Sequence, residues 1–194
     1  MTGAVSILDR FYSMTDVIHS VSKQALSLDL DARAKVAAAR ASLQNARDET
    51  AGLMSIWEIA ANVLGSEEVA VFKLDEPKAV LWLQWCAGVD SRKYICLDVM
   101  REPKLMCVLT GEILFAGEKS AGKLLSIPDP VSALIPIFSG NTVTGVIVIF
   151  RLLPQKAALN AVDREICRVL STRAGQALQP MAADPSAIER DEPR

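Results

Sequence analysis

The stretch VSALIPIFSGNTVTGVIVIF, residues 131–150, decides the fold. It consists of two runs of apolar, largely β-branched residues, separated by Ser139, Gly140, Asn141 and Thr142. Gly and Asn tolerate the positive φ angles that tight hairpin turns require. The stretch therefore predicts two antiparallel strands that are joined at Gly140 and Asn141.

The composition indicates a single domain with an extension and narrows the classes of partner. The 194 residues include 21 basic and 23 acidic ones, so no general positive field would attract a phosphate backbone, and we expect no nucleic-acid partner. Every apolar stretch is broken before the roughly 18 residues that a membrane span needs. Asp9 and Arg10 interrupt the segment where a signal peptide would be apolar. We expect a soluble, cytoplasmic protein without membrane contact.

The cysteines and the single histidine lack the spacing of a metal site. Cys86, Cys96, Cys107 and Cys167 form no CxxC pair, and His19 is distant from all of them in sequence. Free cysteines are commonly small buried hydrophobes, and reduced thiols fit a cytoplasmic address. We therefore expect no bound metal.

The segments before and after residues 131–150 alternate between the hydrophobic spacing of strands and that of helices. Residues 67–75 and 78–88 read as two strands around a turn at Asp75-Glu76-Pro77-Lys78. The middle segment, residues 90–125, is mixed, with a short helix expected near 104–110 and a short strand at 112–116. Residues 159–178 form an amphipathic pattern that Pro180 ends.

The first third of the chain reads as two helices. Residues 5–28 carry one apolar face, and a longer helix is expected from about Asp31 to a C-cap at Gly65. At 1.5 Å per residue that helix would be roughly 50 Å long, which is more than a compact sheet domain covers. Its apolar positions alternate spacings of three and four, the pattern of a coiled coil or a helical bundle. They are Val36, Ala39, Leu43, Ala46, Thr50, Leu53, Trp57, Ala60 and Leu64.

Two interpretations of this seam stay open. It can pair with the first helix of the same chain, or it can form a helical dimer interface at Val36, Ala39, Leu43, Ala46, Thr50, Leu53 and Trp57. Both hold together if two chains form a four-helix bundle. We expect a homodimer.

The order of helix, hairpin, irregular middle, hairpin and helix resembles a GAF domain over about residues 50–180. Residues 132–137, Gly140-Asn141 and residues 144–149 are similar to the family's strand, proline, turn, glycine, strand pattern, and residues 108–115 are similar to the segment before it. The resemblance implies an α+β fold, with an antiparallel sheet, the first and last helices on one face and a pocket under the middle segment on the other. We accordingly expect a helical dimerisation extension at 1–49, a GAF-like domain at 50–180 and a flexible tail at 181–194.

The residues by which known members of the family bind their cofactors have no clear counterparts in this sequence, so the cofactor is unknown. Bilin-binding members share a thioether cysteine and a pocket histidine, whereas His19 precedes the domain here, and the signature of cyclic-nucleotide binders has no counterpart. Members that reduce free methionine sulfoxide use pocket cysteines, and Cys86, Cys96 and Cys107 are close in sequence. A cysteine-dependent reductase is thus the enzymatic alternative to a module with no catalytic residues.

Strand alternation gives a candidate ligand site. Along residues 80–87, one face carries only apolar residues, while the other carries Trp82, Gln84 and Cys86 beside Val80. A ligand pocket is mostly apolar with a few orienting polar groups. We expect Trp82, Gln84 and Cys86 to face the pocket and Arg101 to cap an anionic ligand, the alternative being a pocket that is filled by its own side chains.

No DNA-reading helix pair, kinase signature or phosphoacceptor motif stands out in the sequence. Such a module would report through its own dimer or through a downstream protein partner. The sequence therefore predicts a GAF-like signalling module that binds a small molecule, a protein or both. A protein-docking module without a ligand remains an alternative.

Overall fold

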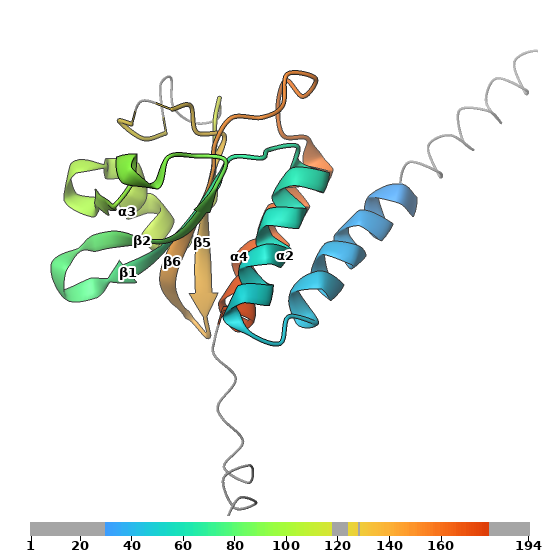
Figure 1. Ribbon diagram of the computed structural model, residues 1–194, viewed down its shortest axis with the longest axis horizontal. Helices are drawn as coiled ribbons and strands as arrows, with labels where there is room; N and C mark the ends of the chain where they lie inside the picture. The colour runs from blue at the N-terminus through green and yellow to red at the C-terminus, as the bar shows by residue number, and fades with distance from the viewer. Residues whose placement is uncertain (1–29, 118–123, 128, 179–194) are drawn as a thin grey trace, which may run out of the picture.

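The computed structural model describes residues 30–117, 124–127 and 129–178 (Figure 1). The expected helix at 5–28, His19 and the expected tail at 181–194 lie outside these residues. The larger elements are α2 (Glu49–Ile59), β1 (Val69–Asp75), β2 (Val80–Ala87), β3 (Cys96–Asp98), α3 (Pro103–Leu109), β4 (Leu114–Phe115), β5 (Ala133–Ser139), β6 (Thr142–Ile149) and α4 (Ala161–Ala177).

The strands form one antiparallel sheet in the order β3-β2-β1-β6-β5-β4. The hairpin predicted from residues 131–150 is confirmed, because β5 pairs with β6 and Ser139 lies opposite Thr142. Gly140, in the turn, has a φ of 61°, which a residue without a Cβ adopts at little cost. This hairpin forms the middle of the sheet, since β6 also pairs with β1.

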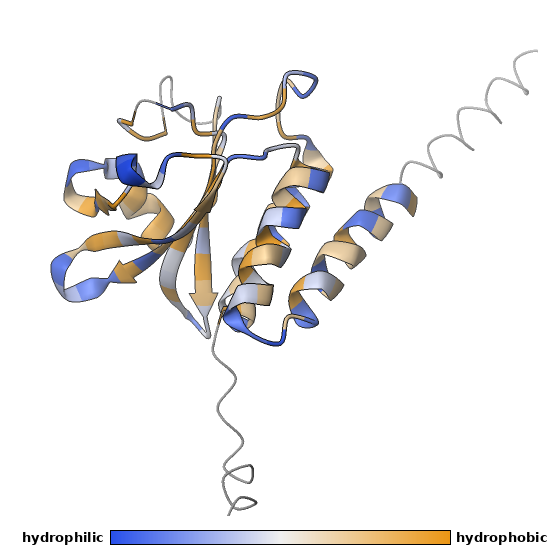
Figure 2. Ribbon diagram, in the orientation of Figure 1, coloured by the Kyte–Doolittle hydropathy of each residue, from blue (hydrophilic) through white to orange (hydrophobic). Residues whose placement is uncertain are grey.

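One side of the sheet, here called the helix face, is covered by α2 and α4, and the helix over residues 30–44 packs on the outer side of α2, away from the strands (Figure 1). Alternate residues of the central strands point to it, and these strands are hydrophobic along most of their length (Figure 2). The strand residues buried there are Val69, Val71, Ala133, Ile135, Ile137, Ile147 and Ile149.

Two glycines let the helices come very close to their neighbours. A Cβ on Gly175 of α4 would lie 1.9 Å from the carbonyl oxygen of Phe138, and one on Gly52 of α2 would lie 2.3 Å from that of Ala177. Both distances are far inside van der Waals contact. The positions of α2 and α4 therefore depend on close contacts between backbones as well as on side-chain packing.

The opposite side, here called the segment face, is covered by described residues of the middle segment and by Ile127 and Val131. Its strand residues include Ala70, Phe72, Leu134, Val146 and Val148, packed in a second buried cluster. The predicted short helix is α3, and the predicted short strand appears as β4. The expected α+β architecture, with helices on one face of an antiparallel sheet, is confirmed.

The long second helix predicted from about residue 31 to Gly65 is wrong as a single rod. The chain is helical over 30–44, turns, and begins α2 at Glu49, with the Asp48 side chain accepting a hydrogen bond from the Ala51 amide at 2.7 Å. The two helices lie against each other, since the Ser55 hydroxyl donates to the Ser42 carbonyl at 3.3 Å. Gly65, in the left-handed conformation at φ 70°, ends the helical region as predicted.

The turn between helix 30–44 and α2 divides the predicted dimer seam between two helices. Ala39, Leu43 and Leu53 are buried within the chain and belong to the core of the helix face, where Ala60 and Leu64 also lie. Val36, Ala46 and Trp57 are half-buried against that core, and Thr50 is exposed. Most of the seam thus serves the fold of one chain, through the contact between helix 30–44 and α2. Pairing of the seam with the helix predicted at 5–28 lies outside the described residues.

Among the helices that the structure describes, none is both long and apolar enough to cross a membrane.

Candidate functional site

The segment face is where the resemblance places a ligand pocket, and the described side chains fill it. The largest side chains on this face, each less than 2% exposed, are Phe72, Leu81, Tyr94, Leu105, Leu134 and Phe150. The rings of Tyr94 and Phe150 lie 5.2 Å apart at 40°, a tilted aromatic contact. The space under the middle segment is therefore a core built from strand, loop and α3 residues.

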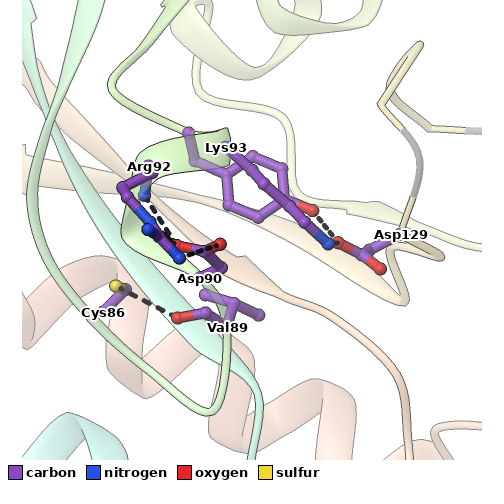
Figure 3. A network of polar contacts seen from close by, with 7 residues as sticks. Cys86, Val89, Asp90, Arg92, Lys93 and Asp129 are labelled. Atoms are coloured by element: carbon purple, nitrogen blue, oxygen red, sulfur yellow. Dashed lines mark hydrogen bonds and ion pairs between the residues drawn. The ribbon is translucent and has the colours of Figure 1, made fainter.

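One polar link crosses this core. The Tyr94 hydroxyl donates a hydrogen bond to the carboxylate of Asp129, and the Lys93 ammonium lies 3.8 Å from the same carboxylate (Figure 3). Burial, and then the neighbouring Asp129, raise the pKa of Tyr94 above its ordinary value. The phenol therefore stays protonated and serves as a donor that ties residue 129 to the start of the middle segment.

A β-bulge separates the three predicted ligand residues of β2. Val71 of β1 pairs with Trp85, but the next residue, Phe72, pairs with Leu83, so Gln84 is an extra residue in β2. The alternation of side chains restarts at that point. The prediction that Trp82, Gln84 and Cys86 share one face is wrong for this reason.

Cys86 packs against the cluster of the segment face, and its thiol donates to the Val89 carbonyl at 3.8 Å (Figure 3). Trp82 lies opposite Lys73, which in turn pairs with Gly145 in β6, so both side chains are on the helix face. Trp82 is 43% exposed there, and its indole nitrogen lies 3.4 Å from the Asp75 carboxylate.

Gln84 lies in a groove on the helix face, beside the start of α2 and the end of α4. The groove has a volume of about 310 Å³ and is lined in part by Glu49, Lys73, Gln84, Thr144, Gly145 and Leu178. The Gln84 amide donates a hydrogen bond to the Glu49 carboxylate. The groove is partly open to solvent, and its lining combines these polar residues with apolar ones such as Phe72 and Ile137.

Arg101 does not reach the interior of the segment face. It belongs to a short helical turn over Val99–Arg101, its side chain is exposed, and its guanidinium pairs with Asp98 at 3.3 Å. The structure thus separates the four predicted ligand residues. Trp82 and Gln84 lie on the helix face, Cys86 packs against the segment face, and Arg101 is exposed on the segment that covers that face.

The cysteines of the enzymatic alternative also lie apart in the fold. Cys86 is on the segment face, Cys96 pairs with Trp82 and so shares the side of the helix face, and Cys107 is exposed on α3. Burial is the larger cause, and Asp90 the smaller, of a raised pKa at the Cys86 thiol. A raised pKa lowers the fraction of reactive thiolate.

Sequence reasoning missed Tyr94, Asp129 and Lys73. Nothing in the local sequence marks Tyr94 as the residue that fills the space under the middle segment, because its partners Phe150 and Asp129 are distant in the chain. Lys73 is a charged residue within an apolar strand pattern. This break in the pattern is the signal that could have located the groove beside Gln84, where the helices do not cover the strands.

Comparisons with known proteins support the fold. No protein-family model and no curated protein sequence matches the chain. Among solved structures, it is similar to the GAF domain of a phosphoenolpyruvate-protein phosphotransferase from Coxiella burnetii, with 14% identity, a TM-score of 0.59, and coverage of 77% of this chain and 93% of that one. The GAF domain/HD domain protein from Geobacter sulfurreducens gives 15% identity, a TM-score of 0.55, and coverage of 70% and 95%.

A third similar structure is an enzyme. The free methionine-R-sulfoxide reductase from Neisseria meningitidis, solved with its substrate, has 15% identity, a TM-score of 0.53, and coverage of 76% of this chain and 89% of that one. Likenesses at such low identity speak for the fold alone. The chain has a GAF-like fold, a fold that sensory domains and methionine sulfoxide reductases share.

Proposed function

We propose that this chain is a GAF-like signalling module that acts by association, with a second copy of itself and with a downstream protein, and holds no small-molecule ligand under its middle segment. One observation carries the proposal. Tyr94, Leu105 and Phe150 occupy the centre of the segment face and are almost completely buried. A ligand of ordinary size needs a cavity of several hundred Å³. These side chains would have to move out of the segment face to open such a cavity.

The proposal also treats the module as non-enzymatic. A cysteine-based reductase needs an accessible, activated thiolate beside its substrate. In this fold Cys86 has a raised pKa, and Cys96 lies on the other side of the sheet. These placements speak against cooperation between the cysteines in one pocket.

A thermal-shift screen of the full chain against nucleotides, amino acids, organic acids and tetrapyrroles tests the absence of a ligand. A compound that binds only the folded state stabilises it by about 2.7 kcal/mol at a hundredfold excess over Kd. We expect no compound to raise the melting temperature. A shift that grows with concentration would contradict the proposal if it is lost in a Leu134→Trp variant that still unfolds cooperatively, since the Leu134 side chain lies on the segment face.

Activity is tested separately. We expect the chain to reduce free methionine sulfoxide no faster than a variant with Cys86, Cys96 and Cys107 all changed to Ser. Turnover that disappears in the triple variant would establish the reductase instead.

A further inference from the structure

At one end of the helix face, the sheet carries a row of residues that the described helices cover only in part. Directly paired residues of neighbouring strands point to the same side of a sheet. One such row runs from β5 to β3 through Ile137, Gly145, Lys73, Trp82 and Cys96. Ile137 and Gly145 are buried, but Lys73 and Cys96 are exposed and Trp82 is 43% exposed. The exposed part of the row, formed by Lys73, Trp82 and Cys96, is here called the open row.

The open row and the groove beside Gln84 form one continuous surface, because Lys73 belongs to both. This surface begins between the start of α2 and the end of α4 and continues past Trp82 to the edge strand β3. From Gly145 to Cys96 it crosses three strand spacings of about 4.8 Å, roughly 14 Å in all. An extended polypeptide advances about 3.4 Å per residue, so about four residues would cover this distance.

The carboxylates beside this surface already have partners, but its lysine does not. The pairs are Asp75 with Lys78 at 3.1 Å, Asp98 with Arg101 at 3.3 Å, and Glu49 with the Gln84 amide. None of the described residues forms an ion pair with the Lys73 ammonium. The surface therefore presents one uncompensated positive charge next to an exposed indole ring. Tryptophan is enriched among the residues that dominate protein interfaces, and a complementary charge helps to orient the partner.

We propose that a short extended segment of a partner protein docks on this surface, with a carboxylate against the Lys73 ammonium and an aliphatic or aromatic side chain against Trp82. The inference rests on the proposed function, since it names the surface that the downstream protein would use. Side chains two residues apart in an extended chain point the same way and lie about 7 Å apart, a separation that the side chains of Lys73 and Trp82 on adjacent strands can match. We therefore expect an Asp or Glu two residues from the apolar anchor of the segment.

A phage-displayed library of random peptides, selected against the full chain, supplies the probe. We expect the selected peptides to carry Asp or Glu two residues from an apolar residue more often than the unselected library does. The affinity of a selected peptide, made synthetically, is then measured by calorimetry on the unchanged chain and on two variants. Lys73→Glu and Trp82→Ala should each raise its Kd at least about tenfold, because one reverses the attracting charge and the other removes the apolar contact.

Two matched controls make the same kinds of change elsewhere. Lys35→Glu reverses an exposed charge on the helix over residues 30–44, and Met106→Ala removes a 49% exposed apolar side chain from α3. Both should leave the Kd unchanged. Lys73→Gln covers the case in which Lys73→Glu or Trp82→Ala disturbs the fold, as circular dichroism would show. It removes the charge without adding a new one, and the Kd should then depend less steeply on salt concentration than it does for the unchanged chain.

Three results would overturn the proposal: no peptide is selected, the selected peptides bind all variants equally, or Lys73→Glu and Trp82→Ala dissociate a homodimer of the chain. The last result would assign the surface to a second copy. These outcomes are distinct from failure of the proposed function. A compound that binds the segment face in the thermal-shift screen would refute the ligand-free module and leave the peptide result standing. A ligand-free chain whose peptides bind independently of Lys73 and Trp82 would do the opposite.

Discussion

The two faces of the sheet are equally well buried but are covered by different kinds of structure. The helix face is covered by α2 and α4, each of which touches a neighbour at a glycine, and the helix over residues 30–44 packs outside them (Figure 1). The segment face is covered by short turns, one two-turn helix and loops, yet Tyr94, Leu105 and Val108 are as deeply buried as any helix residue. Irregular chain can therefore close a core completely. A mixed segment over a sheet is not by itself a sign of a ligand pocket.

The faces also differ in how polar groups hold their covers in place. On the helix face, the Lys156 ammonium lies 2.8 Å from the Asp163 carboxylate and donates to the Val63 carbonyl at 3.1 Å. It thereby joins the end of the first helical region to the start of α4. On the segment face, the corresponding link is the hydrogen bond from Tyr94 to Asp129, a half-exposed carboxylate that also lies 3.8 Å from the Lys93 ammonium. The helix face should accordingly lose more stability when its link is cut.

The largest effect is expected for Lys156→Met. Asp163 is 3% exposed, so removal of the ammonium leaves a buried carboxylate without its counter-charge, and breaking such a pair costs about 3–5 kcal/mol. Urea unfolding measures the loss. The double variant Lys156→Met with Asp163→Asn removes the stranded charge, and it should recover part of the loss in a double-mutant cycle. Lys78→Met, which breaks an exposed pair with Asp75, is the control and should change little.

A loss for Lys156→Met no greater than for Lys78→Met would show that the pair does not hold the helix cover. The contrast between the two faces would then rest on packing alone.

The sequence predicted the centre of the helix face well and its outer layer less well. The hairpin of β5 and β6 could be predicted because Gly140-Asn141 interrupts two β-branched runs, a local signal that needs no knowledge of the rest of the chain. The turn at 45–48 was missed although Asn45 and Asp48 are residues that favour helix ends. A seam with spacings of three and four does not encode whether its partner helix is the next one along the same chain, since Leu43 and Leu53 are buried in either case.

The candidate site was predicted less well because it depends on the register between strands. Trp82, Gln84 and Cys86 share a face only if β2 alternates without interruption, and the bulge at Gln84 breaks the alternation. The run VLWLQWCA contains no Gly or Pro that would mark the position. The filling of the segment face by Tyr94 depends on contacts between distant parts of the chain, which one sequence does not reveal.

The next largest effect tests whether the segment face is a packed core. Leu105 of α3 is fully buried, and Leu105→Ala should lower the free energy of unfolding by about 2–5 kcal/mol through lost contacts and a residual cavity. Its neighbour Met106 is 49% exposed, so Met106→Ala should have almost no effect. Chemical denaturation of the two variants gives the comparison. Equal, small losses would mean that α3 sits over open space, and the two faces would then differ in packing as well as in secondary structure.

The smallest effect is expected for Tyr94→Phe, which removes the hydroxyl and keeps the ring against Phe150. Loss of one hydrogen bond to a charged acceptor should cost about 1.5–3 kcal/mol at neutral pH. The upper end applies only if water cannot reach the Asp129 carboxylate in the variant. Asp129 is part-exposed and keeps Lys93 nearby, so we expect the lower end.

The pH dependence of Tyr94→Phe distinguishes this polar link from packing. Because the pKa of Tyr94 is raised in the folded chain, the phenol is protonated there while an unfolded tyrosine begins to ionise near pH 10. The stabilisation from Tyr94 is therefore complete below about pH 10 and declines by up to about 1.4 kcal/mol per pH unit above it. Unfolding followed from pH 8 to 11 should show the unchanged chain losing stability more steeply than Tyr94→Phe, so that the difference between them narrows. Parallel curves would mean that Tyr94 ionises as readily in the folded chain as in the unfolded one, and that the segment face is open to water at the point where it is joined to Asp129.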